Sequence, residues 1–306
     1  MKKVLMGSVA LLSLAAVLSL GVLPSYLMRA QDIPFTASPG DVGLEFEDVS
    51  IDVPGEDLQL SAWWMPAEAA TAVVLFIHGA NSNKEDTYFG ALDYYAEWVA
   101  RRHHVLAVDL RNHGGSSRTN SGRLAYGREE HRDVSAAITR LVELAPGVPI
   151  IGSGVSMGGA TLIEAAARDE RLKALVLVDP LLDPESATLE GMVAVTGLPH
   201  FLLMPTLWSA RTFFGLDDGG ATPLETAATL DLPVLLIQDP DDPVTRVEFA
   251  SELARANAHV TLELVPPAAA DHPVIVESGP WGSHAGAFRL DPEGTMQRIE
   301  RFLATR

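Results

Sequence analysis

The stretch Gly-Ser-Gly-Val-Ser-Met-Gly-Gly at positions 152–159 is the most informative part of the sequence. A short apolar run, 148–151, precedes it, and a run of good helix formers, 160–168, follows it. Glycines on both sides of Ser156 permit a sharp turn, and such a turn between a strand and a helix lifts the serine above a sheet. The N-terminus of the helix presents free N–H groups to the same place. Ser153 lies outside this Gly-x-Ser-x-Gly frame, so Ser156 is the candidate nucleophile.

The rest of the chain alternates between strand-like and helix-like segments. Continuous apolar runs, as in fully buried parallel strands, occur at 72–77, 105–108, 148–151, 174–178, 233–237 and 260–265. Segments of helical period occur at 90–101, 128–144, 160–168, 247–256 and 294–303. This alternation predicts an α/β fold with a mainly parallel sheet and helices on both faces. Alternating apolar residues at 44–53 and 58–64 predict an additional antiparallel hairpin, which gives about eight strands.

One segment, roughly 180–231, interrupts this alternation. It has no clear strand, and it contains several prolines and an apolar stretch at 192–214. Pro199 and Pro205 argue against a single long helix. We therefore expect a helical cap inserted over the edge of the sheet. If part of the apolar stretch faces Ser156, the site has an apolar pocket, whereas packing of these residues on the sheet is the alternative.

The composition excludes several classes of function. The chain has 306 residues, of which 47% are hydrophobic and 20% charged, so it has ample apolar material for a core. Its net charge of −18 argues against nucleic-acid binding, because an acidic chain repels phosphate backbones. The absence of cysteine excludes disulfides, thiolate chemistry and Cys-based metal sites. No His-x-x-x-His spacing is present, so we expect no metal site.

Residues 1–30 indicate a membrane anchor or a secretion signal. Two lysines precede an uncharged run at 4–23, and about 20 apolar residues suffice to cross a bilayer. A cleaved signal has a shorter apolar core and a small-residue cleavage site, which positions 27–31 fit poorly. We therefore favour an anchor that leaves the body of the protein, 31–306, on the extracytoplasmic side, because paired lysines favour the cytoplasm. Cleavage would instead give a secreted protein.

Loops after the predicted strands complete the pattern. They are His78-Gly79, Asp-Leu-Arg-Asn-His-Gly-Gly-Ser at 109–116, Asp-Pro-Asp-Asp-Pro-Val at 239–244 and Gly-Ser-His at 282–284. In a parallel sheet, such loops meet at the carboxyl edge, where ligands bind. With these motifs and the glycine-rich turn around Ser156 at 154–159, the chain resembles the α/β-hydrolase superfamily over roughly residues 44–304. It is most similar to the serine-dependent esterase and lipase-like branch, since Ser156 stands where other branches have an aspartate.

The resemblance implies a catalytic triad in which Ser156 is the nucleophile, Asp242 the acid and His284 the base. It also implies an oxyanion hole formed by the backbone N–H groups of Met157 and Ala80. The implied reaction is hydrolysis of a small carboxylic ester, with an apolar acyl group, through an acyl-enzyme and without a metal or organic cofactor. Hydrolysis of an amide, thioester or peptide by the same triad is an alternative. A non-catalytic binding module tethered to a membrane is another.

The acid and the base both have rivals in the sequence. Asp242 is favoured because a Pro-Val pair follows it, as in the Asp-x-Val pattern of the family. His284 is favoured because it lies in a Gly-Ser-His-Ala-Gly frame before the last helix, although it stands about twenty residues beyond the last predicted strand. The rivals are Asp179, Asp239 and Asp241 for the acid and His272 for the base.

Overall fold

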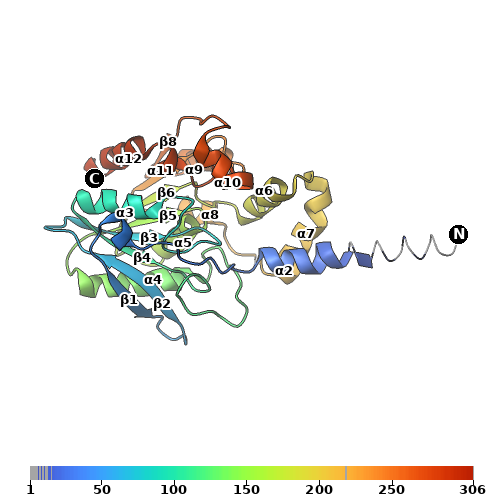
Figure 1. Ribbon diagram of the computed structural model, residues 1–306, viewed down its shortest axis with the longest axis horizontal. Coiled ribbons are helices and arrows are strands. Elements are labelled where there is room, and N and C mark those ends of the chain that lie inside the picture. The colour runs from blue at the N-terminus through green and yellow to red at the C-terminus, as the bar shows by residue number, and fades with distance from the viewer. Residues whose placement is uncertain are drawn as a thin grey trace.

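The computed structural model describes residues 6, 8, 10, 13–14, 16–217 and 219–305. Its centre is an eight-stranded sheet with the strand order β1-β2-β4-β3-β5-β6-β7-β8 (Figure 1). The strands are β1 (Glu47–Asp52), β2 (Gln59–Met65), β3 (Ala72–Ile77), β4 (His103–Val108), β5 (Ile150–Val155), β6 (Leu172–Val178), β7 (Val234–Gln238) and β8 (Val260–Leu264). β2 pairs antiparallel with β1 and β4, and the remaining pairs are parallel. The predicted α/β fold and its hairpin are therefore confirmed.

Helices cover both faces of the sheet and bury a core on each (Figure 1). The main ones are α3 (Ala91–Ala100), α4 (His131–Leu144), α5 (Met157–Ala166), α9 (Val247–Ala256), α11 (Ala287–Leu290) and α12 (Pro292–Ala304). Side chains of α4, α5 and α9 belong to one core, and side chains of α3, α11 and α12 belong to the other. Successive strand residues point to opposite faces, so Leu75 of β3 enters the first core and Phe76 the second.

Strand β5 is longer than its apolar run predicts. The predicted strand ends at residue 151, but residues 152–155 continue it: all four pair with β6, and 152–154 also pair with β3. Glycine is needed there because α5 packs directly on β5. A Cβ at Gly152 would lie 2.9 Å from the side chains of both Leu162 and Leu175. The turn is thus confined to Ser156, and α5 begins at the next residue.

The interruption between β6 and β7 consists of α6 (Pro184–Thr196), α7 (His200–Phe213) and α8 (Pro223–Ala227). Asp183 caps the start of α6 by accepting the Ser186 N–H, and Gly197 ends the helix in the left-handed region at φ +66°. Figure 1 shows α6 and α7 projecting from one end of the molecule, away from most of the sheet. The chain therefore has a helical insertion where the sequence predicts a cap.

The described part of the N-terminal segment forms η1 (Leu18–Val22) and α2 (Leu23–Leu27), which pack against α7. Within the described residues, no helix has both the length and the apolar character needed to cross a membrane. Residues 1–5, 7, 9, 11–12 and 15 of the predicted anchor lie outside the described residues.

Candidate active site

Ser156 occupies the turn between β5 and α5 with φ +51° and ψ −117°. A positive φ is strained for a residue with a side chain, so the surrounding packing must impose it. The Ser156 N–H donates to the Val178 carbonyl at 3.0 Å. A Cβ at Gly158 would lie 2.1 Å from the Ile77 carbonyl oxygen, so only glycine lets α5 start this close to β3. The glycine after the serine thus brings the helix N-terminus to the site.

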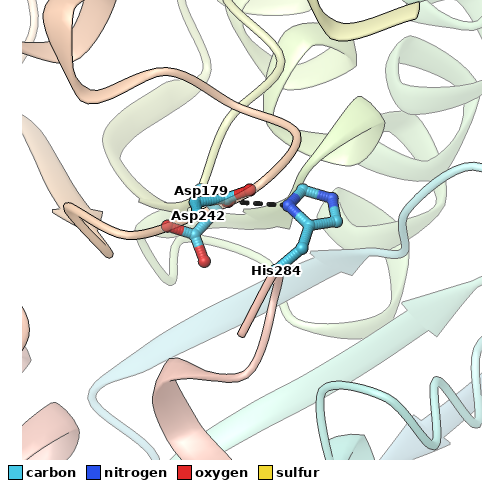
Figure 2. A group of neighbouring side chains, drawn as sticks. All are labelled: Asp179, Asp242 and His284. Atoms are coloured by element: carbon cyan, nitrogen blue, oxygen red, sulfur yellow. Dashed lines mark hydrogen bonds and ion pairs between the residues drawn. The ribbon is translucent and has the colours of Figure 1, made fainter. Parts of the chain in front are cut away.

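His284 and Asp242 meet Ser156 in one hydrogen-bonded chain. His284 Nε2 lies 3.0 Å from Ser156 Oγ. On the other side of the ring, His284 Nδ1 lies 2.7 Å from Asp242 Oδ2 (Figure 2). Asp242 is fixed by further donors: Oδ1 accepts the N–H groups of Val244 and Thr245, and Oδ2 accepts the Thr245 hydroxyl at 2.6 Å. The structure therefore brings together the three residues that the resemblance implies.

The electrostatic environment favours the protonated form of His284. Burial alone acts to lower the pKa of the imidazole, but the negative charge and hydrogen bond of Asp242 outweigh it and raise this pKa above its ordinary value of 6.5. Because Asp242 Oδ2 accepts at Nδ1, that nitrogen carries the proton in the neutral ring and Nε2 is left as an acceptor. Nε2 can then take a proton from Ser156.

Asp179 is a second carboxyl group beside the hydrogen-bonded pair of His284 and Asp242 (Figure 2). It accepts the Asp239 N–H at 2.8 Å and the Ala285 N–H at 3.1 Å, so it joins the loop after β7 to the loop that carries His284. Burial, together with the adjacent charge of Asp242, raises the pKa of Asp179 well above its ordinary value. Asp179 therefore joins the two loops in surroundings that favour its neutral form.

The other rivals for these roles have different partners. Asp239 accepts the N–H of Asp241. Asp241 itself is exposed. His272 caps α10 (Pro273–Ser278), where its Nδ1 accepts the Val274 N–H. Sequence reasoning missed this helix and the short η3 (Gly279–Trp281), which fill the twenty residues between β8 and His284.

Asp179, Asp242 and His284 also satisfy the spacing of a metal site, since their ligand atoms lie within 4.8 Å of one another. Each carboxylate oxygen of both aspartates, however, already accepts a hydrogen bond from the protein. Asp242 Oδ2 in particular accepts from the imidazole that a metal would need. The donor set fits a histidine–carboxylate pair better than a cation site.

The loop after β3 runs beside Ser156. A Cβ at Gly79 would lie 3.5 Å from the Ser156 Cβ. His78 braces this loop: its Nε2 accepts the Leu110 N–H at 3.1 Å, so its Nδ1 carries the proton and donates to the Gly79 carbonyl. Burial lowers the pKa of His78 to about 4, which keeps it neutral. The Ala80 N–H is thus carried by a braced loop, and the Met157 N–H lies in the first turn of α5, where N–H groups have no partner within the helix.

Ser153 lies on β5 three residues before the turn. Its hydroxyl is buried and pairs with the Tyr94 hydroxyl of α3 at 3.0 Å. It therefore belongs to the packing between the sheet and α3.

The chain belongs to the alpha/beta hydrolase family, whose sequence model matches residues 74–288. Similar solved structures include the Pyrococcus furiosus esterase Pf2001, which is 21% identical with a TM-score of 0.72 over 91% of this chain and 97% of that one. A membrane phospholipase A described as a bacterial virulence factor is 21% identical with a TM-score of 0.59 over 100% and 99% of the two chains. An esterase from Thermogutta terrifontis is 17% identical with a TM-score of 0.59 over 85% and 98%. No curated protein sequence matches this chain.

Proposed function

We propose that the protein is a serine hydrolase that cleaves carboxylic esters through an acyl-enzyme on Ser156. The observation that carries this proposal is the unbroken hydrogen-bonded chain from Ser156 Oγ through His284 to Asp242. A serine hydroxyl is a poor nucleophile until an adjacent base takes its proton, and a base needs a third group to fix its tautomer.

In the proposed reaction, His284 Nε2 takes the Ser156 proton while Oγ bonds to the ester carbonyl carbon. His284 then gives this proton to the departing alkoxide as the C–O bond to the alcohol breaks, which leaves the acyl group on Ser156. Water attacks the acyl-enzyme with the same base, and the products are the carboxylic acid and the free serine. Asp242 stabilises the transient imidazolium.

The oxyanion of each tetrahedral intermediate would accept the N–H groups of Met157 and Ala80. Both donors are backbone groups held before the substrate arrives, one by the helix that begins at Met157 and one by the loop that His78 braces. Hydrogen-bond donors that need no reorganisation stabilise the transition state by several kcal/mol, roughly 2.7–4 kcal/mol for one donor.

Two observations support an apolar ester as the substrate. Two of the similar structures named above are described as esterases. The helix α6 lies next to the segment that precedes His284, because a Cβ at Gly191 would be 3.6 Å from the Trp281 ring. The insertion, which is rich in apolar residues, therefore approaches the segment that carries His284, and we propose an apolar acyl group on this ground.

The test compares Ser156→Ala with Ser153→Ala, since Ser153 is a buried serine on β5 three residues before the turn. We expect Ser156→Ala to lower kcat for p-nitrophenyl butyrate by at least roughly 10³-fold and to abolish labelling by a fluorophosphonate probe. Ser153→Ala should keep both activities. Undiminished turnover by Ser156→Ala would refute the proposal. A wild-type chain that reacts with no phosphonate would indicate a binding module, and a preference for aminoacyl amides over a series of esters would indicate an amidase.

A further inference from the structure

Most of the large apolar side chains that are exposed in the described chain lie in two segments. Of twenty such residues, six lie between positions 14 and 26 and seven lie between positions 195 and 213. The most exposed of these thirteen are Phe201 (71%), Phe213 (61%) and Tyr26 (60%). A soluble monomer rarely exposes apolar side chains in such concentration without using them.

The two segments form a single surface, although they are distant in the sequence. η1 and α2 pack against α7, and the Ser209 hydroxyl of α7 donates to the Leu20 carbonyl at 2.5 Å. Figure 1 shows α2 and α7 together at the end of the molecule from which the insertion projects. We call the exposed apolar residues of positions 14–26 and 195–213 the apolar end face.

Helix α7 has two distinct apolar sides. Leu203, Leu207 and Ala210 are buried against the rest of the molecule. Phe201, Met204 and Trp208 follow one another at the three- and four-residue spacing of a helix face, and all three are exposed. The side chains on the exposed side of α7 are therefore not needed to pack the insertion against the rest of the molecule.

The apolar end face is also uncharged. The sequence has no Asp, Glu, Lys or Arg from residue 191 to 210 or from residue 4 to 28, although the whole chain carries a net charge of −18. Arg211 stands at the margin, where it pairs with Glu185 and Asp217. An apolar surface with exposed Trp and Tyr side chains and a charged margin has the character of a segment that enters the membrane interface.

The N-terminal sequence favours a bilayer over a second copy of the chain as the occupant. The first half of the apolar end face is the end of the run at 4–23, which has the length and composition of a membrane span. If the run at 4–23 spans a bilayer, its C-terminal end, which packs against α7, would hold α7 near the surface of the same bilayer. Because the protein is strongly acidic, the bilayer should be neutral, since anionic lipid would repel it.

We propose that the apolar end face docks on a neutral lipid bilayer, with Trp208 and Phe201 inserted at the boundary between headgroups and acyl chains. The docking is a property of this surface and does not depend on the chemistry at Ser156. It also goes beyond anchoring by the N-terminal run, which requires no contact between the side chains of α7 and lipid.

Tryptophan fluorescence tests this proposal in the full-length chain. Of the five tryptophans, all of which the structure describes, Trp208 alone is exposed, while Trp63, Trp64 and Trp98 are buried and Trp281 is half-buried. The protein is reconstituted into phosphatidylcholine vesicles whose acyl chains carry bromine, a contact quencher. A Ser156→Ala background keeps the lipid intact, so the result is independent of the proposed hydrolysis.

We expect bromolipid to quench the emission, and Trp208→Phe to remove most of that quenching, whereas Trp281→Phe should leave most of it. The proposal would be overturned if the protein bound the vesicles and Trp208→Phe left the quenching by bromolipid unchanged. The run at 4–23 would then anchor the chain without docking of the apolar end face. The proposal would also be overturned if bromolipid did not quench Trp208 and the protein had twice the mass of one chain in detergent. That result would identify a second copy of the chain as the occupant. Circular dichroism of each variant checks that it is folded.

Discussion

At the scale of single residues, the environment of His284 is set by three nearby carboxyl groups of which only one bonds to it. Asp242 accepts at His284 Nδ1, while Asp179 and Asp86 contribute to the field at the ring without a hydrogen bond to it. Burial raises the pKa of both Asp179 and Asp86. The hydrogen bond at Nδ1 makes Asp242 the group that would stabilise the imidazolium of the proposed reaction.

The substitution Asp242→Asn tests this assignment. In the proposed reaction the neutral imidazole is the active form, so we expect activity to be lost as the pH falls through the pKa of His284. The raised pKa places that expected loss above about pH 6.5 in the wild type. Without the Asp242 charge, burial lowers this pKa, so the acidic limb of kcat/KM should move to lower pH while the rate falls on the order of 10⁴-fold. Asp241→Asn, an exposed neighbour, is the control. A limb that stays in place in the Asp242 variant would contradict the pairing.

At the scale of elements, the site depends on how closely a helix and two strands approach. Helix α5 starts against the end of β3, and the backbone carbonyls of Ile77 and His78 occupy the space that a side chain at 158 would fill. The same approach places the Met157 N–H and the loop after β3 on either side of Ser156. The position of Ser156 is thus a consequence of backbone packing.

We therefore expect Gly158→Ala to destabilise the fold by about 3 kcal/mol or more, because a Cβ 2.1 Å from the Ile77 oxygen forces the backbone to move. Gly191→Ala in α6 is the matched control, since its Cβ would meet the Trp281 ring at an ordinary 3.6 Å. That change should stabilise by about 0.4–1 kcal/mol through the unfolded chain. Chemical denaturation measures both, and equal effects of the two substitutions would refute the role of close approach.

At the scale of the whole molecule, a buried charge joins elements that are distant in the sequence. Arg111, in the loop after β4, is 2% exposed and bonds to Asp133 of α4 and to Glu56 in the β1–β2 turn. Burial raises the pKa of Asp133 to about 6 even beside this guanidinium. The hairpin, the parallel sheet and α4 are therefore tied by Arg111 and the two carboxyl groups that it bridges.

Arg111→Met should lower the free energy of unfolding by about 3–5 kcal/mol, because the buried Asp133 then loses its counter-charge and keeps only the backbone N–H of residue 111. Adding Asp133→Leu should restore part of this loss, since it removes the buried charge but leaves that N–H without its acceptor. Denaturation of the single and double variants gives the coupling directly. Additive losses in the double variant would show that the two residues act independently.

The sequence predicts the fold well because the relevant signals are local. Continuous apolar runs mark the buried strands, alternation at 44–64 marks the hairpin, and the prolines divide the insertion into short helices. The prediction for β5 was too short, because Gly152 and Gly154 resemble loop residues when considered singly. Their place in a strand follows from the helix that packs on them, which a local pattern does not contain.

The sequence by itself determined the α/β fold, the family and the serine that stands on the turn, because each depends on residues adjacent in the chain. The tertiary structure alone places His284 and not His272 beside Ser156, since α10 and η3 occupy the intervening chain and His284 Nε2 lies within hydrogen-bond distance of Ser156 Oγ. It also decided that Asp242 bonds to the histidine while Asp179 joins the loops, and that η1 and α7 share one apolar face. These outcomes depend on contacts between residues far apart in the sequence, and no local pattern encodes such contacts.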